Sequence, residues 1–164
     1  MTFPDAMPLL LTPSRRPNTG TAGAAAQILG TENSLEFRVG PECRPTEAMD
    51  RATGFTSLVL PALLPATPEA ASTVDTTLAV LTELVDITAR HRASVDLSGR
   101  VSYDGSHVLI TVGDMDQRLP EPEEEPGLFL VHRLTDDIGQ YRGDEAGYTT
   151  WASIPAAWAP SSFV

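Results

Sequence analysis

The sequence predicts an α+β fold, a two-layer sandwich in which helices cover one face of a mixed β-sheet. Stretches of alternating apolar and polar residues indicate strands, and stretches with apolar residues three and four apart indicate helices. Along the chain these stretches follow the order strand, helix, helix, strand, strand, helix, strand. With 41% apolar residues, a chain of 164 residues can bury one core, so we expect a single domain.

The two ends of the chain differ in composition from its centre. Residues 1–31 are rich in proline, alanine, glycine and threonine without a sustained period, which predicts a disordered N-terminal tail. Residues 157–164 are expected to form a short C-terminal tail. The predicted domain therefore covers residues 32–156.

A strand and a helix open the predicted domain. Apolar and polar residues alternate over residues 34–39, as in a half-buried strand. Helical spacing follows over residues 46–60, and Pro61 and Pro65 are expected to end that helix. The apolar positions of the helix are Met49, Ala52, Phe55 and Val59.

The second helix has the clearest amphipathic pattern of the chain. Thr67 is expected to cap it, Pro68 suits its first turn, and Glu69 suits the positive end of the helix dipole. Apolar or threonine positions then step by four, three, four and three residues, which predicts a long buried face. These positions are Val74, Leu78, Leu81, Val85 and Thr88.

A hairpin is predicted next, because strand patterns at residues 94–103 and 107–114 flank Asp104 and Gly105, a favoured turn pair. Residues 114–126 form a loop with three prolines and four glutamates.

The predicted domain closes with a third helix and a strand. The helix is expected over residues 128–138 with Gly139 as its stop. The last strand is expected over residues 147–155, which read GYTTWASIP.

Composition excludes several classes of function. A net charge of −11 and a pI near 4.5 argue against a nucleic-acid surface. No apolar run reaches the roughly 20 residues of a membrane span, and the N-terminus lacks the basic region of a secretory signal, so we expect a cytoplasmic protein. The single cysteine, Cys43, excludes an internal disulfide, and the three histidines lack metal-ligand spacing, so no metal site is expected.

The stretch LTELVDITARHRA, residues 81–93, resembles the long helix of the ATP-binding fold shared by histidine kinases, gyrase-type ATPases and anti-sigma-factor serine kinases (the GHKL proteins). The resemblance is greatest to the short single-domain members abundant in actinomycetes. It implies that Glu83 stands where the family's kinases have a glutamate that helps to activate the attacking group. Ile87 stands where the family has a magnesium-binding asparagine, and a hydrocarbon offers no oxygen ligand to that ion. Asp86 is adjacent but rotated along the helix, so we expect it to point elsewhere.

Two further motifs carry the resemblance. Asp114 matches the aspartate that accepts the adenine amino group in the family, but Asp116 and Arg118 replace the glycines of its turn. Gly127 and Leu128 match the start of the family's phosphate-binding helix. The same helix start then departs from the family, because Phe129 replaces its second glycine, and the family's lysine on the closing strand is Tyr148.

The three glutamates before the third helix suggest what became of the site. Glu123, Glu124 and Glu125 can satisfy the positive end of that helix and would repel a triphosphate. We therefore interpret Asp114, Gly127 and Leu128 as vestigial nucleotide-binding residues and Glu83 as a residual catalytic residue. No cofactor is expected under this interpretation.

The resemblance leaves three functions open. The first is a regulatory protein-binding module similar to an anti-sigma factor, a pseudo-kinase with lost or weakened ATP binding. Its partner would be a sigma factor or an anti-sigma antagonist, with residues 46–60 as the contact region and a homodimer possible. The second is a serine/threonine protein kinase that acts on an anti-sigma factor antagonist with ATP and Mg²⁺, in which Glu83 is the base and Asp114 the adenine anchor. The third is a structural or accessory module.

Overall fold

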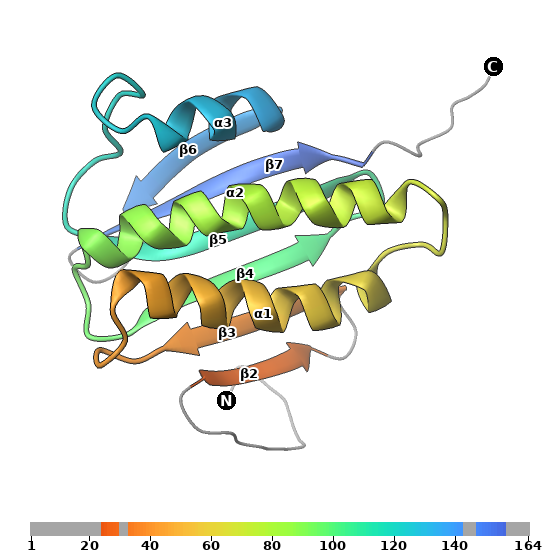
Figure 1. Ribbon diagram of the computed structural model, residues 1–164, viewed down its shortest axis with the longest axis horizontal. Helices are drawn as coiled ribbons and strands as arrows, with labels where there is room; N and C mark the ends of the chain where they lie inside the picture. The colour runs from red at the N-terminus through yellow and green to blue at the C-terminus, as the bar shows by residue number, and fades with distance from the viewer. Residues whose placement is uncertain (1–23, 30–32, 143–146, 157–164) are drawn as a thin grey trace.

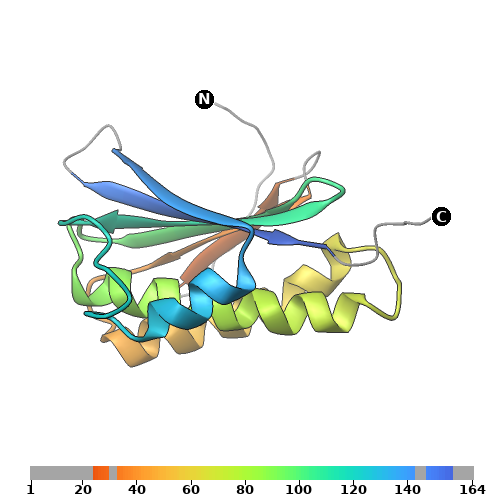
Figure 2. The same ribbon diagram turned by 90° about the horizontal axis from the view of Figure 1, so that it is seen from above.

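The protein is a two-layer arrangement of one antiparallel sheet and three helices that lie on the same face of it (Figures 1 and 2). The computed structural model describes residues 24–29, 33–142 and 147–156, and for the first of these ranges the backbone only. The helices are α1 (Pro45–Leu63), α2 (Ala70–Arg90) and α3 (Gly127–Leu134). This arrangement confirms the predicted α+β class and the placement of the helices.

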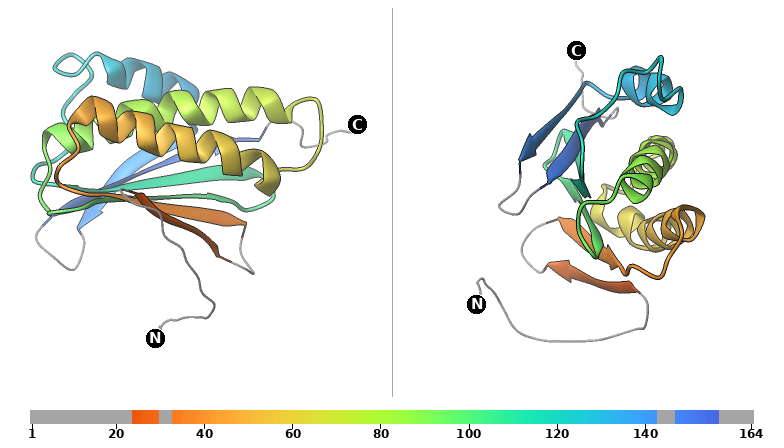
Figure 3. Two further views of the ribbon diagram at one scale, coloured as in Figure 1. Left: turned by 60° about the horizontal axis from the view of Figure 1, so that its bottom comes forward. Right: turned by 90° about the vertical axis from the view of Figure 1, so that its left-hand side faces the viewer.

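The described residues contribute six strands to the sheet, and every pairing between these strands is antiparallel, so the prediction of a mixed sheet is wrong. Antiparallel pairing needs no crossover helix, and none of the described helices lies on the second face of the sheet (Figure 3). In spatial order the strands are β2 (Ala24–Leu29), β3 (Ser34–Val39), β4 (Leu97–Tyr103), β5 (His107–Met115), β7 (Tyr148–Pro155) and β6 (Asp137–Arg142).

The predicted hairpin is present between β4 and β5. The side chain of Asp104 accepts hydrogen bonds from the amides of Ser106 and His107 at 2.8 and 2.7 Å. Those bonds lower the pKa of the Asp104 carboxyl. Gly105 has a φ of 102°, a conformation that glycine adopts without steric cost.

Both edge strands differ from the sequence-based expectation. β2 lies within residues 1–31, for which disorder was expected, while residues 1–23 and the predicted C-terminal tail lie outside the described residues. The third helix ends at Leu134, not at residue 138, because Thr135 is extended and the amide of Asp136 donates to the carbonyl of Ser153. Gly139 is therefore part of β6 and does not stop a helix.

The helix ends also differ in detail. α1 continues past Pro61 to Leu63, and it stops where Leu64 is extended before Pro65, as the residue before a proline prefers. Thr67 does not cap α2, which begins at Ala70 without a side-chain cap.

The core lies between the helices and the sheet. α2 contributes eight buried residues, among them Leu81, Val85 and Thr88 of the predicted face. They pack against the strand residues that point toward the helices, such as Val101 and Ile110. Within the described part of the chain, no helix is long and apolar enough to cross a membrane.

Candidate functional site

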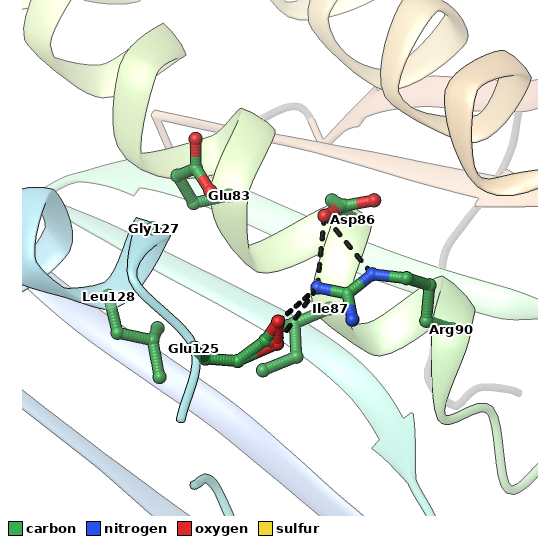
Figure 4. Close-up of a pocket in the computed structure, with 7 residues that line it drawn as sticks. All are labelled: Glu83, Asp86, Ile87, Arg90, Glu125, Gly127 and Leu128. Carbon is green, nitrogen blue, oxygen red and sulfur yellow. Dashed lines mark hydrogen bonds and ion pairs between the residues drawn. The ribbon is translucent and has the colours of Figure 1, made fainter. Parts of the chain in front are cut away.

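A small cavity of about 90 Å³ lies between α2 and the start of α3, and it gathers most of the residues that the sequence singled out. Four of its lining residues come from one face of α2, because residues three and four apart in a helix share a face. They are Glu83, Asp86, Ile87 and Arg90. The other residues come from the start of α3 and the loop before it (Figure 4). The lining residues are Glu83, Asp86, Ile87, Arg90, Glu125, Gly127 and Leu128.

Arg90 lines this cavity and binds two carboxylates. Its Nε and Nη2 atoms donate to Oδ2 of Asp86 at 3.2 and 3.1 Å. Nη2 also donates to Oε1 and Oε2 of Glu125 at 3.1 and 2.9 Å, so the side chain joins α2 to the loop before α3 (Figure 4). The hydrogen bonds to Glu125 and then to Asp86 raise the pKa of the Arg90 guanidinium. Asp86 thus lines the cavity, contrary to expectation, but its carboxylate is already bound.

Glu83 lies against the start of α3. Burial raises the pKa of the Glu83 carboxyl, and the nearby negative charge of Asp86 raises it further. The positive charge of Arg90 lowers this pKa in part, and the negative charge of Glu125 raises it slightly. A Cβ atom at Gly127 would collide with the Glu83 carboxylate, so the approach of the two elements requires glycine at this position.

Two hydrocarbon side chains complete the cavity. Ile87 is 2% exposed and Leu128 is 1% exposed, so both belong to the core as well as to the cavity wall. Ile87 presents only carbon at the position where the family resemblance implies a magnesium ligand.

The glutamates before α3 do not cap it, which corrects the expectation drawn from the sequence. The amides of Leu128 and Phe129 donate to the backbone carbonyls of Glu125 and Pro126 at 2.9 and 3.0 Å, and α3 has no side-chain cap. The Glu125 carboxylate turns to Arg90 instead. Phe129 is 54% exposed and does not line the cavity.

Asp114 is separate from the other predicted site residues. Its Oδ1 atom accepts a hydrogen bond from Oγ1 of Thr149 at 3.2 Å, and its backbone carbonyl accepts one from Ala93 at 2.9 Å. The pairing of β5 with β7 shifts register between Val112 and Met115, and Asp114 lies within that irregularity. Asp114 does not line the cavity.

Gln140 holds the loop after β5 through side-chain contacts that the sequence does not predict. Its Oε1 atom accepts a hydrogen bond from the amide of Leu119 at 2.7 Å. Its Nε2 atom donates to Oγ1 of Thr150 at 3.1 Å and contacts the sulfur of Met115 at 3.6 Å. Gln140 therefore ties the loop after β5 to the inner face of the sheet. Because its partners are 10 to 25 residues away, no local pattern signals this role.

Two arginines lie beside the ring of Tyr148, which stands where the family resemblance implies a lysine. The guanidinium carbons of Arg118 and Arg142 lie 5.9 and 5.1 Å from the centre of the Tyr148 ring. Nη1 of Arg142 also donates to the Tyr148 hydroxyl at 3.0 Å. These distances are typical of cation–π contacts.

The described residues contain no group of three or more side chains placed to hold a metal ion. Neither a protein-family model nor a curated protein matches the chain.

Proposed function

We propose that the protein is a regulatory protein-binding module similar to an anti-sigma factor, in which the ATP pocket is lost or weakened. The observation that carries this proposal is the bridge from Arg90 to Glu125, which joins α2 to the loop before α3 across the space where the family resemblance implies a nucleotide site. An enzyme with a working pocket needs that space open.

The size of the cavity supports the proposal. Pockets for ligands of nucleotide size occupy roughly 300–1,000 Å³. The cavity at Glu83 holds about 90 Å³, which suits a few water molecules rather than a nucleotide.

The charges in the cavity support it as well. Glu83, Asp86 and Glu125 are acidic, and the single guanidinium of the lining is already paired with two of them. A triphosphate entering here would face uncompensated negative charge. Mg²⁺ would relieve that repulsion only with oxygen ligands, and Ile87 provides none.

A protein that no longer turns over nucleotide can still bind a partner through its surface. We propose a sigma factor or an anti-sigma antagonist as that partner and the cytoplasm as the compartment, both on the basis of the family resemblance. The net charge of −11 would steer basic patches of such a partner toward the chain.

Isothermal titration of the protein with Mg-ATP tests the loss of nucleotide binding. We expect no saturable heat up to millimolar nucleotide, and the same result for Arg90→Met, because Ile87 and the small cavity remain in that variant. A micromolar dissociation constant for the unaltered protein would overturn the proposal. Co-purification with candidate sigma factors and antagonists then tests the protein-binding role.

A protein kinase is the second candidate, and one observation favours it. The raised pKa of Glu83 is a property that general bases in active sites share. Transfer of radiolabelled phosphate from ATP to a candidate antagonist, lost in Glu83→Gln, would support the kinase. No transfer by the unaltered protein, with intact binding of the antagonist, would support the binding module.

A further inference from the structure

An open apolar groove lies on the helical layer, where the end of α1 meets the start of α2. The groove has a volume of about 320 Å³, and most of its lining surface is carbon. Pro61 contributes from α1, while Ala70, Ala71 and Val74 contribute from α2, and Asp75 is its one charged lining residue. The two helices lie side by side here (Figures 1 and 3).

Leu58 lies about one helical turn before Pro61 of the groove on α1. Its side chain is 81% exposed, the largest exposure among the large apolar side chains that the structure describes. It precedes Pro61 by three residues and Ala62 by four, so these three residues share one face of α1. An isolated exposed leucine is ordinary, but a leucine beside an apolar groove forms a continuous patch of the kind that marks interaction sites.

The stretch of chain that forms the groove carries negative charge only. Between Arg51 and Arg90 the chain contains no lysine, arginine or histidine. It contains four carboxylates in that stretch, and Glu69 and Asp75 lie at the start of α2 beside the groove. A partner that covers the groove therefore meets carbon at the centre and negative charge at the rim.

We propose that this groove binds a basic amphipathic helix of a partner protein. The inference rests on the proposed protein-binding function and gives it a contact surface. An apolar row on the partner helix would cover Leu58, Pro61 and Val74, as in other helix-in-groove complexes. Arginine or lysine residues beside that row would approach Glu69 and Asp75, which supplies orientation and a faster association rate.

A second copy of the chain fits the groove less well. In a two-fold symmetric dimer the same surface faces itself, so the carboxylates of one rim would approach those of the other. Like charges placed across an interface disfavour that contact. The groove therefore favours a cationic partner over self-association.

Fluorescence anisotropy with a labelled designed peptide tests the proposal. The probe is a helical peptide of about 18 residues with leucines three and four apart and arginines beside them. A second probe has glutamate in place of each arginine, and a third has the arginine peptide's composition in scrambled order. We expect the arginine peptide to bind with a micromolar dissociation constant that weakens as salt rises, and both other peptides to bind at least tenfold more weakly.

Two matched variants locate the binding. Leu58→Glu should weaken the arginine peptide tenfold or more, whereas Val95→Glu, the same kind of change at a residue that is 70% exposed elsewhere, should leave binding unchanged. Circular dichroism verifies that both variants fold, as expected for side chains this exposed. Asp75→Asn should weaken binding severalfold and reduce its salt dependence.

Several results would overturn the groove as the site. They are equal binding to the unaltered protein and to Leu58→Glu, equal binding of the arginine and glutamate peptides, or no binding at millimolar peptide. A dimer in analytical ultracentrifugation that Leu58→Glu dissociates would assign the groove to a second copy instead. If a sigma factor or antagonist binds the unaltered protein and Leu58→Glu alike, the groove fails while the proposed function stands.

Discussion

Substitution of Ile87 by asparagine tests the central feature of the candidate site, because it places an amide oxygen where the family resemblance implies a magnesium ligand. The Ile87 side chain is 2% exposed and packs in the core. Removing it forfeits nearly the whole transfer free energy of a buried aliphatic side chain, about 1.5–3 kcal/mol. An asparagine amide without full hydrogen bonding at this position costs about 1–3 kcal/mol more. We therefore expect Ile87→Asn to lower the free energy of unfolding by about 2.5–6 kcal/mol.

Urea unfolding followed by circular dichroism measures this loss. Ile87→Val is the matched control, because it removes one methylene group without adding a polar atom and should cost about 0.5–1.5 kcal/mol. Repeating both titrations with excess Mg-ATP asks whether the new oxygen creates a site. A ligand whose free concentration is 100 times its dissociation constant would raise the free energy of unfolding by about 2.7 kcal/mol. We expect no such increase while Arg90 and Glu125 remain paired.

Two outcomes would refute the reasoning about Ile87. A loss below about 1 kcal/mol would mean that the side chain contributes little to the core, contrary to its burial. A clear stabilisation of Ile87→Asn by Mg-ATP would mean that the position opens onto an intact nucleotide pocket, and that one lost ligand alone separates this chain from an active relative.

Three further predictions follow from the same region and from α2. Arg90→Met should lower the free energy of unfolding by about 1 kcal/mol, because it leaves two carboxylates without their partner, and urea titrations in low and high salt should show that the loss shrinks as salt rises. Glu83→Gln should stabilise the fold by about a few tenths of a kcal/mol near pH 7, since the native state with its raised pKa loses stability as pH rises through that pKa. The gain should disappear below the ordinary glutamate pKa of 4.5, and a gain independent of pH would contradict a charge effect. Thr77→Val should stabilise the fold by about 1 kcal/mol in thermal unfolding, because the Thr77 hydroxyl is buried and has no hydrogen-bond partner among the described residues; a loss instead would mean that an ordered water satisfies it.

The sequence predicts those elements whose patterns are local. The predicted buried face of α2 is confirmed from Leu81 to Thr88, whereas Val74 and Leu78 are only partly buried and the neighbouring Thr73 and Thr77 are buried instead. The hairpin turn at Asp104 and Gly105 is confirmed, because helical spacing and turn chemistry act over a few residues. The edge strand β6 was missed for the same reason. Its sequence, DIGQYR, is short and has no residue fully buried, and Ile138 continues the spacing of the helix before it, so Gly139 looked like a helix stop.

The candidate site was predicted in part. Helical spacing brings Glu83 and Ile87 onto one face of α2, and the start of α3 meets them there. The bond from Arg90 to Glu125 joins residues 35 positions apart, so no sequence pattern signals it. The separation of Asp114 from the cavity depends on the irregular pairing near the end of β5, which is a tertiary feature.

The contact between Trp151 and the backbone of β6 provides an optical reporter. Trp151 on β7 is directly opposite Gly139 on β6, and a Cβ atom at Gly139 would approach the indole to 2.8 Å. Separation of this edge strand would expose the indole to water and shift its emission to longer wavelength. In a Trp158→Phe background, fluorescence would therefore register fraying at one border of the sheet before the chain unfolds as a whole.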